Sequence, residues 1–245
     1  MSSGGHPVRC ADTAPRSQMA LDLGWGAAAS LDAFHAGADS RPLHALRDFL
    51  EGRETTLYLY GGHGVGKTHL LQAACRHLGE QGMPVAYLPL GTLLSLSPDM
   101  LGGLQRMAMA AIDDVQVVRG RRDWQEELFH LFNGLRDGGG RILLAGAAPP
   151  GDLDIAFPDL VSRLQWGLVM RLAPLSDEEK MAALRDRAQR RGMALPPDAA
   201  RYLLAHYPRD TATLFAMLNR LDEASLESQR RLTIPFIKEV LDKLR

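Results

Sequence analysis

Residues 61–68 restrict the fold of this chain more than any other stretch of the sequence. They are Gly61, Gly62, His63, Gly64, Val65, Gly66, Lys67 and Thr68. An apolar run precedes them and apolar residues at helical spacing follow, which predicts a strand, a loop and a helix. Glycines let successive backbone N–H groups turn toward phosphates, and the helix presents its positive N-terminal end to the same anion. We therefore expect a nucleotide site in which Lys67 reaches the outer phosphates and Thr68 binds Mg²⁺. The alternative is a glycine-rich turn that matches the pattern by chance, and the flanking strand and helix argue against it.

The composition is that of a globular protein with one large domain or two modest ones. The 245 residues are 46% hydrophobic, which is enough for a proper core. Because 28 basic residues balance 29 acidic ones, the net charge of -1 draws the whole molecule neither to DNA nor to acidic membranes. Cys10 and Cys75 do not form a disulfide framework, and no apolar run approaches the roughly 18 residues of a membrane helix. We expect a cytoplasmic protein without membrane contact, whose DNA contact is local or made through a partner.

Residues 1–30 are predicted to be a disordered leader. Residues 1–17 are rich in Ser, Gly and Pro and contain too few apolar side chains to offset the entropy of ordering. Residues 18–23 then place Met19, Leu21 and Leu23 at alternate positions after Gln18, as in peptides that bind extended in a groove. A tail that happens to contain three apolar residues fits the pattern equally well. Met19 could also be the true start of translation, which would remove Gln18.

The remaining chain divides into an α/β part and a helical part. The α/β part, residues 31–173, is predicted as a three-layer α/β/α domain, because helical patterns separate its apolar runs and this alternation is typical of a covered parallel sheet. The predicted five strands lie at residues 57–60, 85–88, 107–112, 142–145 and 168–172. After Pro174 four helical patterns follow, and Ser176 with Glu179 reads as a capping box at the first of them. Residues 174–245 are therefore predicted as a small four-helix domain.

Two acids follow the third predicted strand and belong at the same sheet edge as the glycine loop. Asp113 would hold Mg²⁺ through water, and Asp114 could orient or deprotonate an attacking water, because phosphoryl transfer needs positioning and charge neutralisation. A pair of solvated strand-end acids is the alternative interpretation.

The loop, the acid pair and the helical bundle together resemble the AAA+ ATPases. Several short strings of residues resemble the DnaA-related members of that class, and they resemble the Hda family of replication regulators most closely. The similar strings are residues 67–71, 112–116, 148–150, 160–167 and 172–180, within a resemblance that runs from about residue 31 to the C-terminus. It implies a P-loop AAA+ domain with a C-terminal lid that binds ADP or ATP with Mg²⁺. His69, in the first string, is included among the nucleotide-binding residues.

The resemblance also implies partners and a function. Hda-type proteins carry a clamp-binding peptide of the form Gln-Leu-x-Leu-x-Leu, which residues 18–23 resemble with Met19 at the first Leu. The implied function is negative regulation of replication initiation, by binding the DNA-loaded sliding clamp (the β subunit of DNA polymerase III) and stimulating hydrolysis of DnaA-bound ATP. DNA would then be contacted through the clamp, and a homo-oligomer is possible. Direct origin binding is not expected, because the chain ends at Arg245 where initiators add a helix-turn-helix domain, and residues 89–106 contain one basic residue, Arg106.

Three positions bear on catalysis within this resemblance. Residues 144–148 lack the polar side chain that relatives use to monitor the γ-phosphate, and Ala212 stands where relatives place the sensor 2 arginine. Arg209 is the nearest substitute, so intrinsic ATP hydrolysis is expected to be weak. Arg163 occupies the position of an arginine finger that acts in trans on a neighbouring subunit's ATP, a task that suits its planar fork. The alternative for Arg163 is an (i, i+4) salt bridge with Asp159.

Two rival functions stay open at this point. One is an autonomous P-loop ATPase acting as a helicase loader or transposition helper, and the other is a nucleotide-bound adaptor without chemistry. Whether ADP or ATP is the working ligand is also open. Trp124 and Trp166 are interpreted as packing residues.

Overall fold

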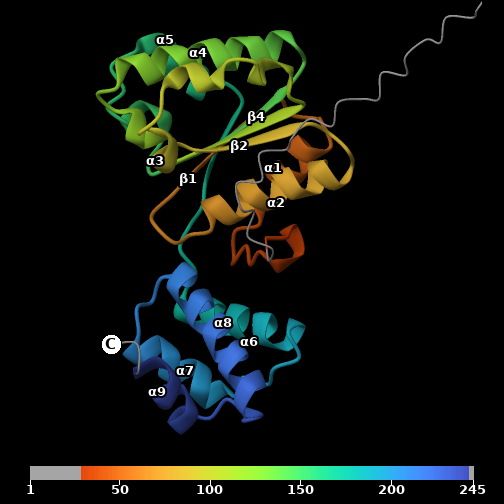
Figure 1. Ribbon diagram of the computed structural model, residues 1–245, viewed down its shortest axis with the longest axis vertical. Coiled ribbons are helices and arrows are strands. Elements are labelled where there is room, and N and C mark those ends of the chain that lie inside the picture. The colour runs from red at the N-terminus through yellow and green to blue at the C-terminus, as the bar shows by residue number, and fades with distance from the viewer. Residues whose placement is uncertain (1–28, 243–245) are drawn as a thin grey trace, which may run out of the picture.

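The computed structural model describes residues 29–242, which form a sheet domain and a separate helical domain (Figure 1). The predicted clamp-binding residues Gln18, Met19, Leu21 and Leu23 lie outside the described residues. Within residues 29–242, no helix combines the length and apolar character needed to cross a membrane.

The sheet has five parallel strands, as predicted. They are β1 (Thr56–Tyr60), β2 (Val85–Pro89), β3 (Met109–Asp113), β4 (Arg141–Gly146) and β5 (Leu168–Arg171), in the order β2-β3-β4-β1-β5. Leu57 of β1 is opposite Leu143 on one side and Leu168 on the other. Every residue of β3 is buried, as expected for a central strand of a parallel sheet that is covered on both faces.

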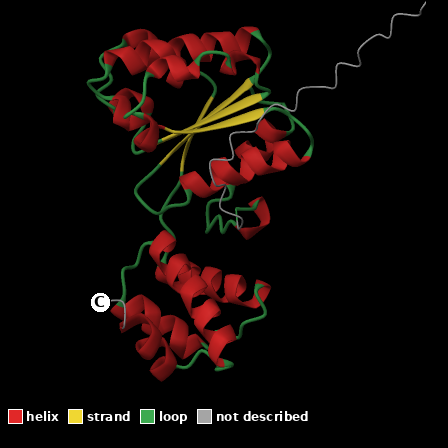
Figure 2. Cartoon of the chain, in the orientation of Figure 1, coloured by secondary structure: helices red, strands yellow, loops and turns green. Residues whose placement is uncertain are grey.

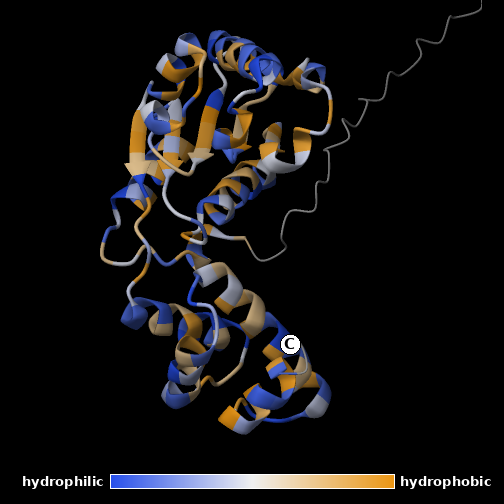
Figure 3. Cartoon of the chain, turned by 90° about the vertical axis from the view of Figure 1, so that its left-hand side faces the viewer, coloured by the Kyte–Doolittle hydropathy of each residue, from blue (hydrophilic) through white to orange (hydrophobic). Residues whose placement is uncertain are grey.

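Helices cover both faces of the sheet, so the predicted three-layer arrangement is confirmed (Figures 1 and 2). On one face lie α1 (Arg41–Leu50) and α2 (Lys67–Glu80), and on the other lie α3 (Leu90–Leu93), α4 (Arg122–Asp137) and α5 (Pro158–Leu164). Alternate residues of the central strand β3 enter opposite cores: Ala110 belongs to the core that contains Trp124 of α4, whereas Ala111 belongs to the core that contains Leu70 of α2. Figure 3 shows the strands coloured mainly as hydrophobic, as this double burial requires.

The C-terminal helices form the predicted four-helix lid. They are α6 (Asp177–Arg190), α7 (Pro197–His206), α8 (Thr211–Ser228) and α9 (Ile234–Asp242). Leu184, Leu203, Leu218 and Phe236, one from each helix, belong to a core of the lid's own. The predicted capping box begins α6: the Glu179 N–H donates to Ser176 Oγ at 3.2 Å, and the Ser176 N–H donates to Glu179 Oε2 at 2.7 Å.

Candidate nucleotide-binding site

The glycine loop connects the end of β1 to the start of α2, where the sequence places it. Gly64 and Gly66 have φ angles of 75° and 96°, in the left-handed region that favours glycine. A Cβ on Gly66 would also lie 2.7 Å from Cε2 of Phe34, so a larger residue would displace that ring. Phe34 therefore lies directly against the loop.

Lys67 is held by the loop that precedes it. Its Nζ donates to the carbonyl oxygens of Gly61 at 2.7 Å and of Gly62 at 2.8 Å. Burial lowers the pKa of Lys67, while the nearby Asp113 and Asp114 act in the opposite direction. The ammonium is thus fixed by the loop, close to Asp113 at the end of β3 and to Asp114 after it.

Asp113 and Thr68 come together although 45 residues separate them in the chain. Thr68 Oγ1 donates to Asp113 Oδ2 at 2.7 Å, and the hydroxyl of Tyr87 donates to the same oxygen at 3.0 Å. Asp113 is only 2% exposed, and this burial raises its pKa. A hydroxyl and a carboxylate oxygen beside a glycine loop are ligands that Mg²⁺ prefers, so this pair fits the ion, with phosphate and water oxygens as its further ligands.

The side chain of Asp114 accepts a hydrogen bond that the sequence did not predict. Its φ of 58° turns the backbone at the end of β3, and Gln116 Nε2 donates to Asp114 Oδ1 at 2.9 Å. Gln116 Oε1 in turn accepts from the Ala147 N–H at 3.0 Å. Gln116 therefore connects the acid to the segment after β4, where the sequence has no polar side chain. In the sequence, Gln116 was marked only as part of residues 112–116, a string similar to relatives.

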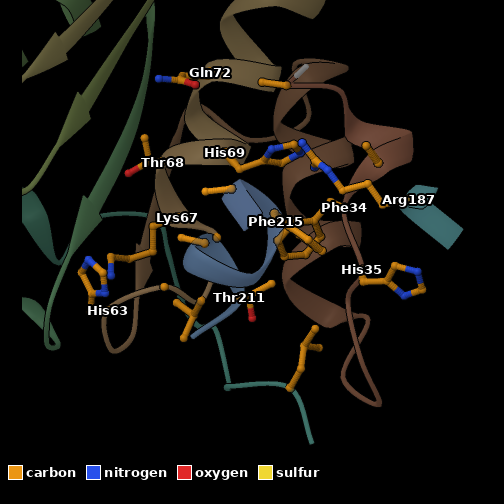
Figure 4. A pocket seen from close by; sticks show the side chains of 18 of the residues that line it. Phe34, His35, His63, Lys67, Thr68, His69, Gln72, Arg187, Thr211 and Phe215 are labelled. Carbon is orange, nitrogen blue, oxygen red and sulfur yellow. The ribbon is translucent and has the colours of Figure 1, made fainter. Parts of the chain in front are cut away.

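A cavity of about 460 Å³ lies between the sheet domain and the lid (Figure 4). Its walls come mainly from three parts of the chain: the loop with the start of α2, the segment before α1, and helices α6 and α8 of the lid; Asp114 and Leu175 complete the lining. The predicted residues that line it are His63, Gly64, Val65, Gly66, Lys67, Thr68, His69 and Asp114. Gly61 and Gly62 contribute through their bonds to Lys67. The glycine loop lines one part of the cavity, where phosphates could bind, and Phe34 and Phe215 line another part.

Arg209, the predicted substitute for sensor 2, is not among the residues that line the cavity. Its Nη1 lies 3.3 Å from Asp177 Oδ2, and its side chain is 62% exposed. Arg187 of α6 lines the cavity instead, together with Ala212. Sequence reasoning missed Arg187 because it is one of several arginines on a polar helix, and nothing in the pattern separates it from the solvated ones.

Arg163 lies on α5, at the opposite face of the sheet from the glycine loop's helix. The alternative interpretation of Arg163 is wrong, because the described residues contain no ion pair between Arg163 and Asp159. Its guanidinium instead lies 5.0 Å from the ring centroid of Trp166 and 5.7 Å from that of Phe129. Trp166 is 48% exposed, so it is not the packing residue that we predicted, whereas Trp124 is fully buried.

Family models match two parts of the chain. Residues 177–241 match the model described as Hda, lid domain. Residues 100–171, which include the acid pair and Arg163, match the model of the bacterial DnaA ATPase domain.

Solved structures with this fold include DnaA proteins. Domain III of the Thermotoga maritima replication initiation protein DnaA is 27% identical, with a TM-score of 0.75 over 87% of this chain and 95% of that one. The AMPPCP-bound DnaA from Aquifex aeolicus is 25% identical, with a TM-score of 0.67 over 78% of this chain and 64% of that one. A Thermotoga maritima RuvB variant is 16% identical, with a TM-score of 0.65 over 88% of this chain and 72% of that one, and shares the fold alone.

The parallel sheet, the glycine loop at its edge and the helical lid define an AAA+ protein. Within that class, the lid and ATPase-domain matches make the chain an Hda- and DnaA-related AAA+ protein.

Proposed function

We propose that this protein binds ADP or ATP with Mg²⁺ in the cavity between the sheet domain and the lid. The contact between Thr68 and Asp113 beside Lys67 supports this assignment, because it gathers a cation and two Mg²⁺ ligands at the glycine loop. The AMPPCP-bound DnaA structure is a related protein with a nucleotide analogue.

We further propose that the protein is a DnaA-related replication regulator of the Hda type. It would bind the DNA-loaded sliding clamp and stimulate hydrolysis of DnaA-bound ATP. The observation that carries this proposal is the match of residues 177–241 to the Hda lid model. The ATPase-domain match is shared with DnaA initiators, so the lid match is the one that favours an Hda-type regulator over an initiator.

Arg163 is the residue that would act on the initiator's ATP. Within the described residues it has no carboxylate partner among the ion pairs, so its charge is not neutralised on its own surface. The guanidinium carbon lies within cation–π distance of the Trp166 and Phe129 rings, and these contacts would restrict the guanidinium while leaving its N–H groups to an incoming phosphate. A partner's γ-phosphate that approached α5 would therefore meet a cation that is already oriented.

The decisive test measures ATP hydrolysis by DnaA with this protein alone, with DNA-loaded clamp alone and with both. We expect stimulation only when both are present. Hydrolysis of ATP by this protein without DnaA or clamp would favour an autonomous ATPase instead.

A nucleotide-bound adaptor without chemistry is the second candidate, and two contacts favour it. Asp114 is engaged by Gln116, and Arg209 faces Asp177 rather than the cavity, so two groups expected near the phosphates have other partners. Such an adaptor would bind DnaA and nucleotide yet leave the initiator's ATP turnover unchanged.

A further inference from the structure

The end of the cavity formed by α6 and α8 contains a cation without an anionic partner. Arg187 of α6 lines the cavity, and none of the ion pairs in residues 29–242 involves it. Its Nε is buried without a hydrogen-bond partner, and its Nη2 has a long contact of 3.5 Å with Asn219 Oδ1. Burial and the neighbouring Arg191 both lower the pKa of Arg187, so its surroundings do not stabilise the charge. A half-buried cation of this kind, with Nε unpaired, leaves donors available to a ligand.

Asp186 of α6 and Asp222 of α8 are both paired with cations other than Arg187. Asp186 pairs with Arg190 at 2.8 Å and lies 3.6 Å from His35. Asp222 pairs with Arg191 at 3.1 Å. The protein therefore neutralises Arg190 and Arg191, about one turn further along the chain, and leaves Arg187 facing the cavity.

The side chains around Arg187 suit a flat ring with hydrogen-bond acceptors. Its guanidinium carbon lies 4.6 Å from the ring centroid of Phe215, and the rings of Phe34 and His69 stack with centroids 6.2 Å apart. Figure 4 shows the guanidinium turned toward His69, on the opposite side of the cavity from Lys67. Aromatic and apolar walls with a few donors are typical of sites that bind the ring of a ligand rather than a small hydrated anion.

The ring of His69 is held by the segment before α1. The carbonyl oxygen of Ser30 lies 2.9 Å from Nε2, and because a carbonyl only accepts, the proton of this hydrogen bond is on Nε2.

We propose that Arg187, assisted by Asn219, binds the base of a nucleoside di- or triphosphate through the acceptor atoms of that base, while Lys67 holds the phosphates. Adenine offers such acceptors at N3 and N7. The inference rests on the proposed nucleotide site and assigns the part of the ligand that the glycine loop does not contact.

The test compares two ligands that share phosphates but differ in having a base. Isothermal titration with ADP and with pyrophosphate, each with Mg²⁺, would be run on the full chain and on Arg187→Met, which keeps the apolar stem against Phe215 and removes the donors. We expect roughly tenfold weaker ADP binding and unchanged pyrophosphate binding, as one lost hydrogen bond from a charged donor predicts. Lys67→Ala should weaken the binding of both ligands. Arg190 is a cation on the exposed side of α6, so Arg190→Met should weaken the binding of neither.

Three results would overturn the inference. Unchanged ADP affinity in Arg187→Met would show that the guanidinium does not contact the base. An equal loss for ADP and pyrophosphate would place Arg187 at the phosphates. A lower urea midpoint of the ligand-free variant with no change in the ADP-to-pyrophosphate ratio would make its role structural. Parent protein that binds neither ligand would instead refute the nucleotide site itself, so the two failures are distinguishable.

Discussion

The guanidinium of Arg163 lies beside two aromatic rings and, within the described residues, is in no ion pair with a carboxylate, so the effect of removing it can be predicted. Arg163→Ala should abolish stimulated ATP hydrolysis by DnaA while leaving the fold, clamp binding and nucleotide affinity intact. Arginine fingers contribute roughly 10³- to 10⁵-fold in rate, or about 4 to 7 kcal/mol of barrier. Arg163→Lys should not restore the rate, because an ammonium cannot reproduce the fork. The measurement is DnaA-bound ATP turnover with DNA-loaded clamp.

Arg122 provides a matched control for that experiment. It also stacks on an aromatic ring, 3.9 Å from the centroid of Phe157, and belongs to the neighbouring helix α4. Arg122→Ala should leave stimulation unchanged. An Arg163→Ala protein that melts several degrees lower yet still stimulates hydrolysis would identify Arg163 as a stabilising surface residue.

Trp166 is expected to act through Arg163 as a positioning residue. Trp166→Ala removes one of the two rings that hold the guanidinium, and an exposed cation–π contact is worth about 0.5–1 kcal/mol. Stimulation should therefore fall a few-fold and not vanish, while Trp166→Phe should restore most of it. Equal stimulation by Trp166→Ala and the parent would show that stacking does not orient the finger.

At the scale of elements, the hydroxyl of Ser176 makes one of the two hydrogen bonds of the capping box that begins α6. Ser176→Ala leaves the Glu179 N–H without its side-chain acceptor, and the loss of an N-cap serine typically costs about 1 kcal/mol. We expect a correspondingly lower urea midpoint for the lid. Ser228→Ala, which removes a hydroxyl bonded within the last turn of α8, is the control and should change the midpoint less. Equal losses in both variants would show that capping does not stabilise α6.

The sequence predicted those features that local patterns encode. The capping box follows from the spacing of Ser176 and Glu179, and the parallel sheet follows from apolar runs that alternate with helical patterns. Contacts between separate elements left no such pattern. Gln116 reaches the segment after β4, and Arg187 enters the cavity from the lid, because the tertiary fold brings these elements together.

Over the whole molecule, the lid and the sheet domain both contribute walls to one cavity, so a ligand there contacts both. Thr211 and Phe215 of α8 face the cavity together with Lys67 of α2. A ligand that binds only the folded state stabilises it by mass action, by about 2.7 kcal/mol at a hundred times Kd. Nucleotide binding would then favour one placement of the lid relative to the sheet, and with it the surface that the protein presents to a partner.

Clamp binding is the one proposed activity that would depend on residues outside both domains. Replacing Leu21 and Leu23 by Ala should abolish retention on immobilised clamp, because apolar anchors carry most of the affinity of such peptides. The melting temperature and ADP affinity should not change, since residues 18–23 precede the described domains. Leu226→Ala, at a leucine that is 75% exposed on the lid, is the matched control and should leave retention intact. Retention of the double variant at the parent's level would remove the peptide from the proposal, whereas loss in both variants would move the clamp contact to the lid.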